Sequence, residues 1–320
     1  MKSKKGVISI QFNWIFILIA GVLILLFFGS LVLKGKDASD TSVAGTILTN
    51  MQTILTGAEV SVRTINQIKI PDKEIKVSCD SISVGKVPTP ITKNKIIFAP
   101  DIIKGRTLLT WALDWNVPYH VTNFLYLTTP DIKYIFIEPL DDKANELFNL
   151  LPDEINKKKE EISNIKDTGN NFKLVFFDGL DPIVPPGLSS VPDKRVSAIS
   201  VNSGSNEIKF YNKRGNEFKS TGTADYLGDP LVFGAMFSGS REDYECNLEK
   251  AFNKLKIVSM VYEERTNTLR GLYSGTGCRS YYSAPIIDYS TTSIDEVKMV
   301  ISSIETSNQY LQSSSCPTIY

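Results

Sequence analysis

The sequence has one histidine among 320 residues, and the spacings that mark common catalytic and metal sites are missing. No His-x-x-x-His or Cys-x-x-Cys pair occurs, which argues against zinc. There is no Gly-x-Ser-x-Gly elbow, no Walker loop and no Gly-x-Gly-x-x-Gly segment after a strand, so hydrolase and nucleotide-binding motifs are absent. His120 alone satisfies the histidine requirement of a Ser-His-Asp site, but a structural or surface role is favoured. We predict no catalytic residue and no cofactor, with an enzyme as the alternative.

An excess of charge is also lacking. Lysine and arginine number 35, as do aspartate and glutamate, so the chain has no electrostatic footprint for nucleic acid. The basic run 157–159 is followed at once by Glu160 and Glu161, which is typical of a solvated surface.

One long apolar run is present near the N-terminus. The segment from Gly6 to Leu33 carries no charge, and from Trp14 to Leu33 it is apolar except for Ser30. Twenty helical residues span about 30 Å, the thickness of a bilayer's hydrocarbon core. The pattern predicts a transmembrane helix over 14–34 and a lipid bilayer as partner; a cleaved secretory signal is the alternative.

The flanking charges suggest an orientation. Lys2, Lys4 and Lys5 precede the run, whereas Lys34 and Lys36 after it are diluted by nearby aspartates. The positive-inside rule therefore predicts a cytoplasmic N-terminus, a cell-membrane location and residues 35–320 outside the cytoplasm.

All four cysteines lie beyond the apolar run: Cys79, Cys246, Cys278 and Cys316. An even number in an oxidising compartment indicates two disulfides with three possible connectivities. Free buried thiols and a metal site are the alternatives.

The rest of the chain divides into three parts. An apolar stripe from Ala44 to Ile65 predicts a helix within 35–66, ended by Pro71. Residues 67–240 mix strand-like and helical runs and predict an α/β (mixed α+β) domain with at least one parallel crossover between Tyr134 and Phe177. Residues 212–216 predict a hairpin loop with Gly215 in the left-handed position. The strand-like runs are Glu74–Ser78, Ile96–Phe98, Val121–Leu127, Tyr134–Ile137, Leu174–Phe177, Val196–Val201, Ile208–Tyr211 and Leu231–Phe237; the helical runs are Arg106–Asp114 and Lys143–Ile165.

Residues 241–320 predict a helical pair packed on that domain. Apolar spacing marks a long helix over about 242–273, and Ser293 to Glu296 form a capping box that opens a second. A continuous first helix separates Cys246 from Cys278 by too great a length for these two to bond. If the second helix returns along the first, Cys316 pairs with Cys246 and Cys79 with Cys278, which is the connectivity we favour.

Residues 1–13 form a recognisable pattern. Lys4 to Phe12 reads Lys-Lys-Gly-Val-Ile-Ser-Ile-Gln-Phe, which resembles the class III signal of archaeal type IV pilin-like proteins. The resemblance implies cleavage after Gly6 by a prepilin-type peptidase, leaving Val7 as the first residue. Gln11 stands where the family typically has glutamate. The null alternative is a plain signal anchor.

Two segments of the larger domain, Ile97–Asp101 and Trp115–Tyr119, look like those of uncharacterised archaeal membrane-anchored proteins. That resemblance implies no activity. Aromatic residues concentrate around Trp111, Trp115 and Tyr126, where core packing is the default interpretation and a binding groove is the alternative.

Three strand-like runs end in acids, and these supply the candidate metal ligands Asp101, Glu138, Asp141, Asp178 and Asp181. If the strands are parallel neighbours, the carboxylates meet at the carboxyl edge of a sheet, where open α/β folds bind ligands. Oxygen ligands suit Ca²⁺ or Mg²⁺. The alternative is turn formation and helix capping.

Taken together, these features favour a single-pass, membrane-anchored surface or envelope protein with an interaction or scaffolding role and a protein partner in the envelope. The resemblance at residues 4–12 implies a pilin-like origin. The alternative is a tethered enzyme or ligand-binding domain that uses the acidic strand ends. A pocket lined by Trp115 and its neighbours would indicate ligand capture instead.

Overall fold

The computed structural model describes residues 18, 21, 22, 25, 26, 45, 48, 49, 51–53, 55–70, 73–85, 87–90, 95–178, 180–290 and 293–320. The predicted processing site at Gly6, Val7 and Gln11 lies outside these residues, as does most of the predicted segment 14–34. No helix found among the described residues is long and apolar enough to cross a bilayer.

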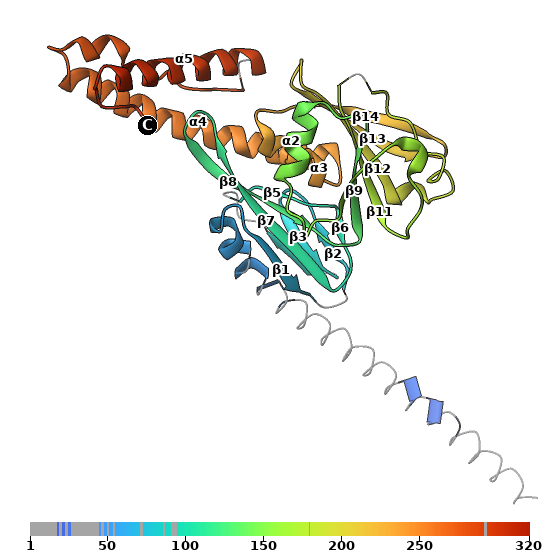
Figure 1. Ribbon diagram of the computed structural model, residues 1–320. Coiled ribbons are helices and arrows are strands. Elements are labelled where there is room, and N and C mark those ends of the chain that lie inside the picture. The colour runs from blue at the N-terminus through green and yellow to red at the C-terminus, as the bar shows by residue number, and fades with distance from the viewer. Residues whose placement is uncertain are drawn as a thin grey trace, which may run out of the picture.

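Three sheets form the body of the molecule (Figure 1). Sheet A has the order β1-β7-β8-β5, sheet B the order β4-β3-β2-β6, and sheet C the order β10-β9-β11-β12-β13-β14. The strands of sheet A are β1 (Ile65–Lys69), β7 (Thr107–Asn116), β8 (His120–Thr128) and β5 (Ile97–Phe98). Those of sheet B are β4 (Val87–Pro90), β3 (Ser81–Val84), β2 (Ile75–Val77) and β6 (Ile102–Ile103).

Sheet C contains the predicted parallel crossover. Its strands are β10 (Lys157–Glu160), β9 (Ile132–Ile137), β11 (Asn171–Phe176), β12 (Val196–Asn202), β13 (Glu207–Arg214) and β14 (Glu217–Asp225). Strand β9 leads through α2 (Asp142–Leu150) into β10, and both β10 and β11 pair with β9 in parallel. The predicted hairpin follows, with Gly215 at φ +63° between β13 and β14, the left-handed conformation that favours glycine.

Two predicted segments have the wrong type. Residues 106–114 were expected to be helical, but from Thr107 onward they belong to β7, which lies between β1 and β8 and is buried along most of its length. A strand that is buried on both faces has apolar residues in an unbroken run. It therefore lacks the alternation of apolar and polar residues by which a strand is recognised. The predicted helix 143–165 is shortened in the same way, to α2 followed by β10 and the 3₁₀ turn η1 (Ile162–Asn164).

The reverse error concerns 231–237, expected as a strand and observed within α3 (Asp229–Phe237). Every residue from Leu231 to Phe237 is buried, and a short helix that is apolar all round carries no amphipathic period. Pro230 in its first turn is the usual signal of a helix start. This helix packs against both large sheets: Phe233 contacts Trp111 of β7 at 5.1 Å between ring centroids, and Phe237 contacts Tyr134 of β9 at 5.0 Å.

The predicted C-terminal helical pair is present as α4 (Arg241–Leu272) and α5 (Ile294–Ser313), the latter opened by the expected capping box at Ser293. Helix α4 extends away from the sheets, and α5 lies along its outer part (Figure 1). Short 3₁₀ turns are η2 (Asp193–Arg195) and η3 (Gly277–Tyr281). The first predicted helix ends earlier than Pro71: its described helical residues stop at Val60, and β1 begins at Ile65.

All four cysteines form disulfides, but the favoured connectivity is wrong. Cys79 bonds Cys246, and Cys278 bonds Cys316. The expected return of α5 is made instead by the segment before it, where Ile287 donates to Ser259 and Tyr289 stacks on Phe252. Helix α5 then runs outward again and leaves Cys316 beside Cys278.

The predicted fold class is therefore corrected. We expected an N-terminal transmembrane helix, an α/β domain and a C-terminal helical pair. The described structure is a mixed α/β fold made mostly of β-sheet, with C-terminal helices, and it contains no described helix able to span a membrane.

Candidate functional site

The carboxyl edge of sheet C brings together several of the predicted acids. Because β9 and β11 are parallel neighbours, Glu138 and Asp141 after β9 lie at the same edge as Asp178 after β11. Asp141 caps α2 by accepting from the Ala144 N–H, and Asp178 accepts from the Ser203 N–H at 2.8 Å. These two carboxylates therefore perform the capping and turn-forming role that was the alternative interpretation.

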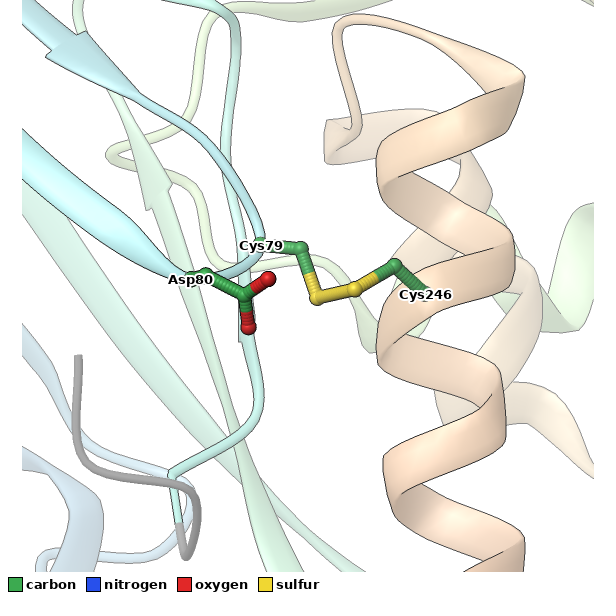
Figure 2. Close-up of side chains that lie close together, drawn as sticks. All are labelled: Cys79, Asp80 and Cys246. Atoms are coloured by element: carbon green, nitrogen blue, oxygen red, sulfur yellow. A yellow bond between two sulfur atoms is a disulfide. The ribbon is translucent and has the colours of Figure 1, made fainter. Parts of the chain in front are cut away.

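Asp101 lies elsewhere, because β5 pairs with β8 in sheet A and not with β9. Of the described residues, the only group of three or more potential metal ligands within 4.8 Å comprises Cys79, Asp80 and Cys246. Figure 2 shows that the two sulfurs of this group are joined to each other, with Asp80 to one side. Disulfide sulfurs are poor metal ligands because the thiolate is the binding form. Asp80 instead pairs with Lys250 at 2.9 Å.

A second charged cluster lies where the three sheets meet α4. Asp101 lies near Asp243 of α4, whose negative charge acts on the Asp101 carboxyl. Asp243 also accepts from the Cys79 N–H at 3.0 Å and from the Ser240 hydroxyl at 2.9 Å. Gly239 passes so close to Asp101 that a Cβ there would lie 1.8 Å from the carboxylate.

The electrostatics of this cluster follow from its burial. Burial and the neighbouring Asp243 charge raise the pKa of Asp101. Lys173 on β11 is 6% exposed and donates to the Ser238 carbonyl. Burial lowers the pKa of Lys173 to about 8, against the opposing effect of Asp101. The cluster joins sheet B, sheet C and α4. We therefore interpret it as a structural cluster that holds the sheets in place relative to one another.

A groove crosses from sheet A to sheet C. This α2–β7 groove has a volume of about 890 Å³ and is lined by residues 149–154 at the end of α2 and just beyond it, 113–116 of β7 and 228–230 at the start of α3, with Arg63, Ile65, Trp111 and Phe233. Trp115 lines it, as the ligand-capture hypothesis expected, but is only 1% exposed and donates its indole N–H to the Leu227 carbonyl. The accessible apolar side chain is Leu150, 48% exposed.

Acidic side chains dominate the rim of the groove. Asp114, Asp153, Glu154 and Asp229 line it together with one base, Arg63. Three of the acids have ion pairs: Asp114 with Arg63 at 3.5 Å, Asp153 with Lys157 at 3.1 Å and Asp229 with Lys143 at 2.7 Å. His120, on the edge of this region, contacts Asn116 at 3.2 Å. The groove therefore combines an apolar contact with a lining in which acids outnumber bases, and in the described structure Glu154 is the acid without an ion pair.

A shallower hollow lies at the carboxyl edge of sheet C. This carboxyl-edge hollow has a volume of about 810 Å³ and is lined by residues 138–140 and 161–163 with Ile183 and Pro186. Of the predicted metal ligands, Glu138 lines this hollow, whereas Asp181 is exposed on the loop after β11.

Sequence reasoning missed Leu150, Asp153 and Glu154. The available signal was Pro152, which interrupts the helical pattern and so marks a helix end, but nothing in the local sequence indicates that β7 lies opposite. Glu161 was missed because it was interpreted as part of a solvated charge run.

Comparison of the chain with protein-family models, with curated proteins and with solved structures finds no match.

Proposed function

We propose that this chain is an extracytoplasmic protein with an interaction role, and that the α2–β7 groove holds a segment of a partner protein. The observation that carries the proposal is the groove itself: an open hollow whose lining places the exposed apolar side chain of Leu150 among four acidic side chains. Binding sites combine apolar contact area with a few polar groups that fix orientation. The four acids and single base predict a partner segment with lysine or arginine beside an apolar residue.

Both disulfides support the location. Every cysteine in the sequence is oxidised, and such bonds persist outside the reducing cytoplasm. Intact mass before and after reduction and alkylation tests this. Four alkyl groups gained only after reduction are expected, and alkylation of the untreated protein would contradict it.

The same mass measurement, on protein extracted from its native membrane or envelope, tests the predicted processing. A chain beginning at Val7 supports a prepilin-type peptidase as a partner, and a chain beginning at Met1 rules it out.

Site-specific photo-cross-linking tests the groove. A photoreactive phenylalanine analogue replaces Leu150 in the full chain, expressed in its own cells, and the matched control replaces Met299, which is 64% exposed on α5. We expect a polypeptide adduct from position 150 and none of the same mass from position 299. Identical adducts at both positions, or none at position 150, would overturn the proposal.

The chemistry of the partner is tested next. The Asp153→Lys/Glu154→Lys variant reverses two acidic charges of the groove and leaves Leu150 unchanged. We expect at least about tenfold weaker binding of the cross-linked partner, with a strong dependence on salt in the wild type.

A further inference from the structure

The carboxyl-edge hollow lies where the connections of sheet C diverge. The strand order is β10-β9-β11-β12, so the chain leaves β9 toward one side of the sheet and leaves β11 toward the other. Adjacent parallel strands whose connections separate in this way leave a crevice beyond their carboxyl ends, and open α/β sheets bind ligands in that crevice. The residues that line the hollow follow β9, β10 and β11.

The walls of the hollow are mostly apolar. Pro139 and Leu140 contribute from the loop after β9, Ile162 from η1, and Ile183 and Pro186 from the loop after β11. Ile183 is 53% exposed, so its side chain presents apolar surface to whatever enters. A ligand with a hydrocarbon body gains by covering this surface.

Among the described residues of the lining, the ionisable groups are two carboxylates, Glu138 and Glu161. Neither is in an ion pair with another side chain in the described part of the chain, whereas the neighbouring Glu160 is paired with Lys158. Two unneutralised carboxylates beside an apolar wall favour a cation over a neutral or anionic ligand of the same shape.

The loop after β11, which forms one wall of the hollow, is held in place by contacts with β13 and with the core. Lys213, 2% exposed, donates to the carbonyls of Ser189 and Val191 and pairs with Asp193 at 3.2 Å. Leu188 is completely buried, and Gly187 packs so tightly that a Cβ would lie 2.2 Å from the Ile165 carbonyl oxygen. The wall is therefore formed before any ligand arrives, which lowers the entropic cost of binding.

We propose that the carboxyl-edge hollow is a second binding site, separate from the α2–β7 groove, for a small organic cation with a short hydrocarbon body. The cationic group lies between Glu138 and Glu161, and the hydrocarbon body lies against Ile183 and its apolar neighbours.

Calorimetric titration of the full chain with hexylammonium chloride at pH 7 tests the proposal, since an alkylamine is fully charged there. We expect saturable binding with a Kd of about 1 mM. Hexanol and sodium hexanoate, of the same length but neutral and anionic, are expected to bind at least about tenfold more weakly. Absence of saturation by hexylammonium up to about 20 mM, or equal binding of hexanol, would overturn the proposal.

Two pairs of variants locate the site. Glu138→Gln/Glu161→Gln removes both charges, and its control is Glu305→Gln on the exposed surface of α5. Ile183→Ser removes the apolar wall, and its control is Ile257→Ser, 63% exposed on α4. We expect about tenfold loss of hexylammonium affinity for the first and about threefold for the second, with wild-type affinity in both controls and unchanged near-ultraviolet circular dichroism in all four. Unchanged affinity in the double variant would contradict the site even where hexylammonium binds.

Discussion

The α2–β7 groove and the carboxyl-edge hollow have similar volumes, about 890 and 810 Å³, but different parts of the fold hold them in shape. The groove has sides from sheet A, α2 and α3, so its width depends on the core between two sheets. The hollow has walls from three loops on sheet C alone, so it depends on how those loops are fastened. Substitutions in the core are therefore expected to reduce affinity mainly at the groove, and substitutions in the loops mainly at the hollow.

The largest effect is expected from Trp115→Ala. The indole is 1% exposed, stacks on Phe124 at 5.3 Å and donates to the Leu227 carbonyl beneath the groove. Its removal is expected to lower the free energy of unfolding by about 3–5 kcal/mol, measured in guanidinium chloride. Partner affinity is expected to fall more than hexylammonium affinity in the protein that remains folded. An equal loss at both sites would show that they are not held independently.

Lys213→Met is expected to weaken the carboxyl-edge hollow and to spare the α2–β7 groove. It leaves the carbonyls of Ser189, which is part-buried, and Val191, which is buried, without their donor, at a cost of about 2–3 kcal/mol in the free energy of unfolding. Hexylammonium affinity is expected to fall while partner affinity is retained. Lys219→Met is the matched control, because that side chain is 67% exposed and lies 4.0 Å from its acidic neighbour. Comparable losses in both variants would show that burial of Lys213 is unimportant.

Gly187→Ala sharpens the same test by adding a single methyl group. The Cβ would lie 2.2 Å from the Ile165 carbonyl oxygen, so the loop after β11 must shift, at a cost of about 1–3 kcal/mol. Gly275→Ala is the control, since no atom lies within 4 Å of a Cβ there. Wild-type stability and hexylammonium affinity in Gly187→Ala would contradict the tightly packed wall.

The position of Asp101 near Asp243 predicts that the stability of the folded protein depends on pH. The pKa of Asp101 is raised above 3.8 in the folded protein, so the folded state binds a proton more tightly than the unfolded state. This contribution to stability is present below the folded pKa and decreases as the pH rises from about 3.8 through the raised value.

Asp101→Asn is expected to remove that dependence. Relative to the variant, the wild type loses stability as the pH rises through this window, by no more than about 1 kcal/mol because the carboxylate is in contact with solvent. Guanidinium midpoints of the two proteins across this range measure the difference. A constant difference would contradict the raised pKa of Asp101.

The smallest effect on stability is expected from Arg63→Ala. The Arg63 side chain is 77% exposed and pairs with Asp114 at 3.5 Å, so the free energy of unfolding is expected to change by less than about 0.5 kcal/mol. Removing the one base in the described lining of the groove is nevertheless expected to increase the affinity for a basic partner segment by about two- to threefold. A decrease would show that Arg63 contacts an acid of the partner.

The parts of the fold that were predicted correctly are those with a local signal. The amphipathic period of α4, the capping box at Ser293 and the glycine of the β13–β14 hairpin each follow from neighbouring residues. Strand β7 and helix α3 were interchanged in type because both are apolar on all sides, and burial of that kind removes the period that distinguishes strand from helix.

The candidate sites were less predictable because they depend on pairings between distant segments. Placing Glu138 and Asp178 at one edge required only that β9 and β11 be parallel, and this expectation is confirmed. Asp101 was assigned to the same edge on an equally good strand-end pattern, but β5 pairs with β8. The disulfide partners failed for a related reason, since the segment before α5 makes the return that α5 was expected to make.

The central claim is that the α2–β7 groove holds a segment of a partner, and one measurement tests it most directly. The affinity of the partner cross-linked at position 150 is measured by anisotropy for the wild type, Leu150→Lys and Met299→Lys. A positive charge at position 150 repels a basic segment and removes the apolar contact. Leu150→Lys is therefore expected to bind at least about tenfold more weakly, whereas Met299→Lys is expected to bind as the wild type does. Equal affinities for all three proteins would contradict the claim.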